Sequence, residues 1–254
     1  MKLPMMIAAL VLSAMLPAAN ATNPQANVDP LDSARWEEMQ KTFLTGHPFV
    51  FDPQVKVTGP ADAENPLQVP VTVDATALGK VEEVVVFADF NPIVQILRFY
   101  PGEAAAYLGF RVKLQQSSPV RAAVRTKDGV WHVGGTWVNT VGGGCSSPSV
   151  GTAMPAWQKQ LNNVSARQWR DGELAGRLRL RVVHPMDTGL VSGIPAFHLQ
   201  EIRLTDSNDQ LLMRIETFEP VSENPVFTVQ QQSAGRVRAS GRDNNGNIFS
   251  VWID

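Results

Sequence analysis

Cysteine is nearly absent from this 254-residue chain, which contains one, Cys145. A single cysteine can form neither an intramolecular disulfide nor a CxxC redox pair, so its thiol is free, modified or bonded to another molecule. The four histidines and the one cysteine also show no spacing typical of a metal site. We therefore expect no metal and no cofactor.

An excess of charge of either sign is missing as well. The 22 basic and 24 acidic residues leave a formal net charge of −2, and lysines and arginines form no uninterrupted cluster. Such a balance gives no overall attraction to nucleic acid or to an anionic membrane surface. Beyond the N-terminus no apolar run approaches the ~18 residues of a spanning helix. We expect neither a nucleic-acid partner nor membrane insertion.

The N-terminus has the pattern of an export signal. Lys2 precedes a short apolar stretch that closes with Ala19-Asn20-Ala21, a small-x-small cleavage site. This pattern predicts that residues 1–21 are a signal peptide and that the mature protein is exported.

Residues 22–45 are expected to form a leader and a short helix. Residues 22–30 are polar and predict a flexible leader. The stretch DSARWEEMQKTF then has apolar residues at helical spacing behind Asp32 or Ser33 as the N-cap.

After Gly46 the pattern changes to short β-rich runs separated by Gly, Pro, Asn and Asp. This pattern predicts a mainly β fold with two antiparallel β-sandwich halves and short flanking helices. One of these helices is expected to start at Pro155. The predicted strands are 55–57, 67–74, 81–89, 93–100, 107–114, 119–126 and 130–139 in the first half, and 177–184, 198–206, 210–218, 225–232, 235–243 and 247–254 in the second.

The run PVRAAVRT has the clearest alternation. Small apolar residues alternate with Arg121 and Arg125, so we expect these two arginines on a solvent-exposed face. The Asp-Gly pair that follows favours a tight hairpin with the run 130–139.

The cysteine lies between the two halves, in the sequence VGGGCSSP, within a predicted glycine-rich loop and linker at 141–165. Gly142, Gly143 and Gly144 contribute no side chains, and fixing three glycines costs much conformational entropy. We therefore expect a mobile, solvent-exposed arm. The alternative is a buried and inert thiol.

A mobile thiol is better suited to carriage than to catalysis. A nucleophilic cysteine needs a base held in hydrogen-bonding reach, and no local signature ties any of the four histidines to Cys145. An extended arm of about seven residues on each side could instead project the sulfur ~20 Å into a partner's active site.

Two stretches resemble known families. SSPVRAAVRTKDGVWHVGGTWVNTVGGGC resembles the end of SoxY, a periplasmic subunit that carries sulfur intermediates on a cysteine at the tip of a glycine-rich arm. The segments RLRLRVVHPMDTG, IPAFHLQEIRL, VSENPVFTV and NGNIFSVWID resemble SoxZ, its immunoglobulin-like partner. The order of the two matches is similar to that of fused SoxYZ-like carriers found with periplasmic quinoprotein dehydrogenases.

The resemblance implies a SoxY-like sandwich at 46–140 and a SoxZ-like immunoglobulin-like sandwich at 166–254. It implies that Cys145 is the covalent attachment site of a carrier of sulfur-containing intermediates, as in thiosulfate oxidation, and that Gly142, Gly143 and Gly144 form its arm. The protein would not be an enzyme. Its partners would be periplasmic redox enzymes, either of the sulfur-oxidation type or a quinoprotein dehydrogenase.

Two points stay open at this stage. The segment HPMDTG is more simply a strand end and a turn, and its resemblance makes His184 and Asp187 candidates for domain docking or for lining the resting place of the cysteine. The chain continues after Cys145 into the second half, so its arm is a loop tethered at both ends. The alternative function is a non-covalent binding or assembly module for a periplasmic quinoprotein dehydrogenase.

Overall fold

The computed structural model describes residues 28–44, 46–151, 157–171, 175–231 and 235–254. The predicted signal peptide, most of the predicted leader and the predicted helix start at Pro155 lie outside these ranges. Within them, no helix is long and apolar enough to cross a membrane.

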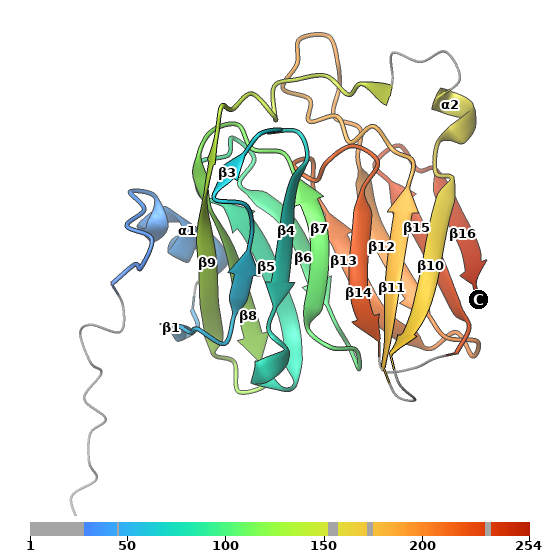
Figure 1. Ribbon diagram of the computed structural model, residues 1–254, viewed down its shortest axis with the longest axis horizontal. Coiled ribbons are helices and arrows are strands. Elements are labelled where there is room, and N and C mark those ends of the chain that lie inside the picture. The colour runs from blue at the N-terminus through green and yellow to red at the C-terminus, as the bar shows by residue number, and fades with distance from the viewer. Residues whose placement is uncertain (1–27, 45, 152–156, 172–174, 232–234) are drawn as a thin grey trace, which may run out of the picture.

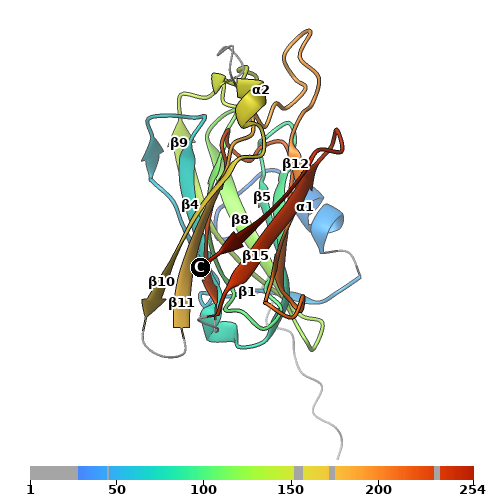
Figure 2. The same cartoon turned by 90° about the vertical axis from the view of Figure 1, so that its right-hand side faces the viewer.

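The fold consists of two facing β-sheets with few helices (Figures 1 and 2). The first half contains α1 (Trp36–Phe43), β1 (Phe49–Phe51), β2 (Lys56–Thr58), β3 (Asp62–Ala63), β4 (Val69–Asp74), the 3₁₀ turn η2 (Thr76–Leu78), β5 (Val81–Ala88), β6 (Gln95–Tyr100), β7 (Tyr107–Val112), β8 (Ser118–Thr126) and β9 (Trp131–Thr140). The second half contains α2 (Trp157–Gln160), β10 (Val164–Asp171), β11 (Ala175–Val182), β12 (Leu199–Thr205), β13 (Leu211–Thr217), β14 (Val226–Gln231), β15 (Val237–Asp243) and β16 (Ile248–Ile253).

Both sheets run through both halves of the chain. The larger sheet has the order β1-β9-β8-β5-β6-β13-β12-β15-β16 with β3 beside β9, and the smaller has the order β10-β11-β14-β7-β4-β2. The halves join where β6 pairs with β13 and β7 pairs with β14. This pairing provides hydrogen-bond partners for backbone N–H and C=O groups that would otherwise be unpaired on edge strands. The mainly β sandwich prediction is confirmed, but the two sandwiches are fused edge to edge around one continuous core rather than linked only by a loop.

Most predicted elements are present. The helix behind the leader is α1, although it follows Arg35 without a side-chain cap, and the Asp-Gly turn joins β8 and β9 as predicted. Three strands were missed. β1 and β3 are very short and pair in parallel with β9, and β10 begins inside the predicted linker with a mostly polar sequence.

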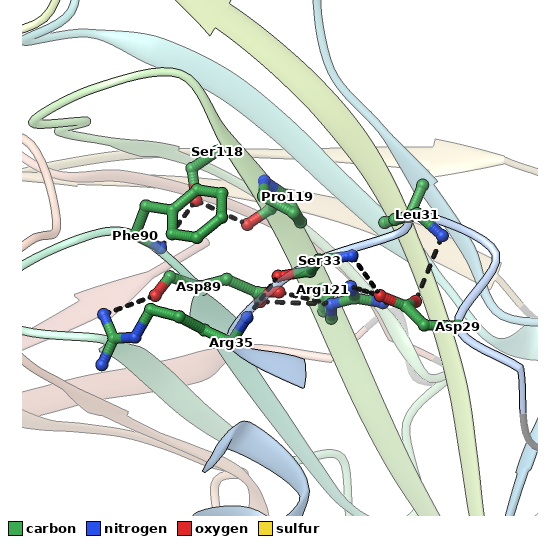
Figure 3. Close-up of polar contacts among 9 residues, drawn as sticks. All are labelled: Asp29, Leu31, Ser33, Arg35, Asp89, Phe90, Ser118, Pro119 and Arg121. Carbon is green, nitrogen blue, oxygen red and sulfur yellow. Dashed lines mark hydrogen bonds and ion pairs between the residues drawn. The ribbon is translucent and has the colours of Figure 1, made fainter. Parts of the chain in front are cut away.

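The prediction that Arg121 faces solvent is wrong. Its side chain is only 1% exposed, and it donates hydrogen bonds to Asp29 at 2.7 and 2.8 Å and to Asp89 at 3.1 Å (Figure 3). Its guanidinium also lies 4.7 Å from the ring centre of Trp36 on α1. The end of the leader and α1 therefore cover this face of the sheet, and Asp29 is held in place rather than flexible. Arg125, further along β8, remains partly exposed.

Candidate functional site

Cys145 lies at the junction of the two halves and is fully buried. Its thiol donates to the carbonyl oxygen of Lys113 at 3.5 Å, and its backbone N–H donates to Oε1 of Gln115 at 3.2 Å. From the second half, the hydroxyl of Thr188 donates to the Cys145 carbonyl at 2.6 Å. The expectation of an exposed, mobile thiol is therefore wrong for this conformation, and the alternative of a buried thiol describes it.

The three glycines suit the backbone turns and close approaches of this segment. Gly142 and Gly143 have φ angles of +86° and +87°, which residues with a Cβ rarely adopt. A Cβ on Gly144 would lie 2.2 Å from the carbonyl oxygen of Pro66. Each glycine allows the chain to turn into, or press against, the end of the sandwich.

Backbone hydrogen bonds fix the segment before the cysteine. The N–H groups of Gly143 and Gly144 donate to the carbonyls of Gln115 and Leu114, each at 3.0 Å. The Gln115 side chain accepts from the N–H of Ser146 at 3.1 Å as well as from that of Cys145. The segment therefore lies along residues 113–116, which continue β7.

Two carboxylates of the second half hold the segment after the cysteine. Asp187 accepts the N–H of Ser149 at 3.1 Å, and Glu223 accepts the N–H groups of Val150 at 2.8 Å and Gly151 at 2.7 Å. We call residues 142–151 the cysteine loop. The loop is anchored to the first half through residues 143–146 and to the second half through residues 149–151.

His184 does not contact the thiol. Its Nδ1 accepts the N–H of Met186 at 3.1 Å, its Nε2 lies 3.5 Å from Asp243, and its ring packs on Phe197. Burial lowers its pKa to about 4, which the nearby Asp243 carboxylate only partly offsets. His184 is therefore a neutral residue that shapes the HPMDTG turn, whereas Asp187 of the same turn contacts the cysteine loop directly.

Lys113 is a residue of the site that sequence reasoning missed. It is 4% exposed, and its ammonium donates to the carbonyl of Met186 across the junction. Burial lowers its pKa to about 8, against the opposing attraction of Cys145, Asp187 and Glu223. In sequence it is the next-to-last residue of the β-rich run YLGFRVKL, where a lysine is expected at the surface. Only the pairing of the halves buries it.

The same burial makes the thiol a poor nucleophile. Loss of hydration raises the pKa of Cys145 to about 11, and the positive charge of Lys113 offsets this only in part. At pH 7 a thiol with that pKa is thiolate in only about one molecule in ten thousand. In this arrangement the site can store a thiol but cannot readily react through it.

A cavity of about 230 Å³ lies beside the cysteine loop. Its lining comes from both halves and from the loop, but Cys145 is not part of it. The thiol would reach this space only if the loop moved. The lining residues are Asn65, Leu67, Gln68, Lys113, Ser147, Pro148, Ser149, Val150, Pro185, Glu223 and Asn224.

In the described part of the chain, no cluster of three or more His, Cys, Asp or Glu side chains could hold a metal ion. His132, on β9, pairs with Asp52 at 2.7 Å, on the first half of the sandwich.

The fold and site define a class: a double β-sandwich in one chain, with one enclosed cysteine on a loop between its halves. The model of the sulfur oxidation protein SoxY matches residues 39–145, and that of the sulphur oxidation protein SoxZ matches residues 167–252. The chain belongs to the SoxYZ-like family, as a SoxY domain followed by a SoxZ domain. The resemblance seen in the sequence is confirmed.

Among solved structures, the chain is similar to the sulfur carrier protein SoxY from Chlorobium limicola f thiosulfatophilum. The two are 17% identical with a TM-score of 0.38, and the match covers 42% of this chain and 96% of that one. No curated protein matches the chain significantly.

Proposed function

We propose that this protein is a non-enzymatic carrier that holds a sulfur-containing intermediate covalently on Cys145 and presents it to partner enzymes. The observation that carries the proposal is that the SoxY match ends at residue 145, which is the only cysteine of the chain. Loading would join Cys145 to the sulfur of a second thiol-type compound as a disulfide. This step releases two protons and two electrons, and the partner redox enzyme accepts the electrons.

The carrier would alternate between a closed and an open form. The closed form, with a fully buried thiol of pKa about 11, protects Cys145 from unwanted reactions. In the open form, the contacts of Asp187 and Glu223 with residues 149–151 would break and the cysteine loop would leave the end of the sandwich. Because the loop is tethered at both ends, the five residue steps from Thr140, at the end of β9, to Cys145 would limit its reach to ~17 Å.

We further propose that the carrier acts in the periplasm, with enzymes of the sulfur-oxidation type or a quinoprotein dehydrogenase as partners. Residues 1–21 support export because they combine a basic start, a short apolar stretch and the Ala-Asn-Ala sequence. N-terminal sequencing of the protein from the producing cells tests this. A mature chain starting at Thr22 supports the proposal, and a chain that keeps residues 1–21 contradicts it.

The burial of Cys145 also favours a second candidate function, a non-covalent binding or assembly module for a periplasmic dehydrogenase. In that case Cys145 would serve only as a small apolar residue in the core of the junction. The carrier function requires the sulfur atom of Cys145 to form a covalent bond, whereas the binding function does not.

Replacing Cys145 by serine in the producing cells separates them. Serine keeps the size and the hydrogen bond but cannot hold a sulfur adduct. The carrier proposal predicts that thiosulfate-dependent sulfate formation is lost in Cys145→Ser and retained in the control Ser146→Ala. Normal sulfate formation by the serine variant, at normal protein level, would rule out covalent carriage.

A further inference from the structure

A row of outward-facing residues crosses the six-stranded sheet and leaves a hollow in its outer surface. Arg179 on β11 is paired with Thr228 on β14, which is paired with Gly109 on β7, which in turn is paired with Thr72 on β4. These four strands are neighbours in the sheet (Figure 1). Paired residues of adjacent strands lie on the same face of a sheet, so Gly109 leaves a gap between the two threonines. The resulting hollow has a volume of about 170 Å³.

Four side-chain donors around this hollow have no partner among the residues that the structure describes. Arg111 and Arg179 both line it, and neither guanidinium forms an ion pair with any residue that the structure describes. The hydroxyls of Thr72 and Thr228 likewise make no hydrogen bond within the described ranges. Two forked cationic donors and two hydroxyls therefore surround one small space.

The surroundings of the hollow are also basic. Arg167 is paired with Arg179 across β10 and β11, and Arg177 and Arg181 alternate with it along β11. Positive charge gathered on one face of a chain with net charge −2 raises the local concentration of anions there.

We propose that this hollow is a binding site for a small tetrahedral oxoanion such as sulfate or phosphate. The guanidinium groups of Arg111 and Arg179 would donate paired hydrogen bonds to the oxygens of the anion, and the hydroxyls of Thr72 and Thr228 would complete its coordination. Gly109 has no side chain, so its backbone forms the bottom of the hollow. The inference rests on this face alone and does not depend on carriage by Cys145.

NMR titration of the ¹⁵N-labelled full chain with inorganic sulfate, and separately with inorganic phosphate, tests the site at constant ionic strength. We expect saturable shifts of the backbone amides of Gly109 and Thr228. Arg179→Gln and Arg111→Gln should each weaken binding by about tenfold or more, because each removes charge-assisted hydrogen bonds. The matched control is Arg177→Gln, which removes an outward arginine from the same strand but does not border the hollow.

Gly109→Ala is a second, independent variant. The added Cβ would lie 3.5 Å from Cβ of Thr228 and 3.7 Å from Oγ1 of Thr72, which are ordinary contact distances. The fold should therefore be kept, while the methyl group fills part of the hollow. Binding should weaken in this variant although no charge is lost. Absence of saturable shifts, or an equal loss in the Arg177→Gln control, would overturn the proposal, because the face would then attract anions only diffusely.

Discussion

Replacing Glu223 by alanine should release the cysteine loop and speed the alkylation of Cys145. In the closed form the thiol is fully buried, and its pKa is about 11. Compared with an ordinary thiol of pKa about 8.5, its thiolate fraction at pH 7 is lower by a factor of about 300. Alkylation of the wild-type protein should therefore occur almost entirely through transient opening of the loop.

The size of the effect follows from two hydrogen bonds. The Glu223 carboxylate accepts the N–H groups of Val150 and Gly151 at 2.8 and 2.7 Å, and it is only half-buried. Bonds to a charged acceptor contribute about 1.5–3 kcal/mol each, and water would replace part of this at a half-buried site. A net loss of about 2 kcal/mol raises the open population, and hence the alkylation rate, by about 30-fold.

The assay is the rate of iodoacetamide labelling at neutral pH, followed by intact mass. Glu219→Ala is the matched control, because it removes a carboxylate that also acts electrostatically on Lys113 but has no hydrogen bond to the cysteine loop. The reasoning is refuted if Glu223→Ala labels no faster than Glu219→Ala. It is also refuted if the wild-type thiol reacts as fast as the thiol of the unfolded chain.

Three further results are expected. Gly144→Ala should lower the melting temperature and speed the alkylation of Cys145, because the added Cβ would lie 2.2 Å from the carbonyl oxygen of Pro66. An unchanged melting temperature together with an unchanged alkylation rate would contradict the close packing. Arg121→Met should destabilise the fold by about 3–5 kcal/mol in urea unfolding, because it leaves the buried Asp89 carboxylate unpaired, and a loss below 1 kcal/mol would argue against the ion pair. Burial lowers the pKa of His184 to about 4 from an ordinary 6.5. Between these two pH values the unfolded chain takes up a proton and the folded chain does not. The free energy of unfolding should therefore fall as the pH drops from 6.5 toward 4. The urea midpoint of His184→Gln should depend less on pH in this window, and an unchanged slope would exclude the histidine as the cause.

The strands could be predicted from sequence because alternation and turn residues are local signals. The run 119–126 and its Asp-Gly turn gave the hairpin of β8 and β9 directly. The burial of Arg121 was missed, because its partners Asp29 and Asp89 are 92 and 32 residues away in sequence. The alternating sequence pattern is the same whether the arginine faces solvent or is covered by another segment of the chain.

The site was predicted in part. Sequence singled out Cys145, and the HPMDTG segment led to Asp187, which contacts the cysteine loop. The exposed thiol was predicted wrongly, because three glycines are compatible both with motion and with the positive φ angles and close approaches found here. Lys113 could not be found either, since only the joining of the two halves buries it.

The central claim, that Cys145 carries a covalent sulfur intermediate, is tested most directly by intact mass. The protein is purified from the producing cells without reductant, and its mass is measured before and after reduction. The account predicts a sulfur-containing adduct that maps to the peptide with Cys145 and disappears on reduction. A bare thiol at this position in cells actively oxidising reduced sulfur compounds, or an adduct of glutathione alone, would contradict it.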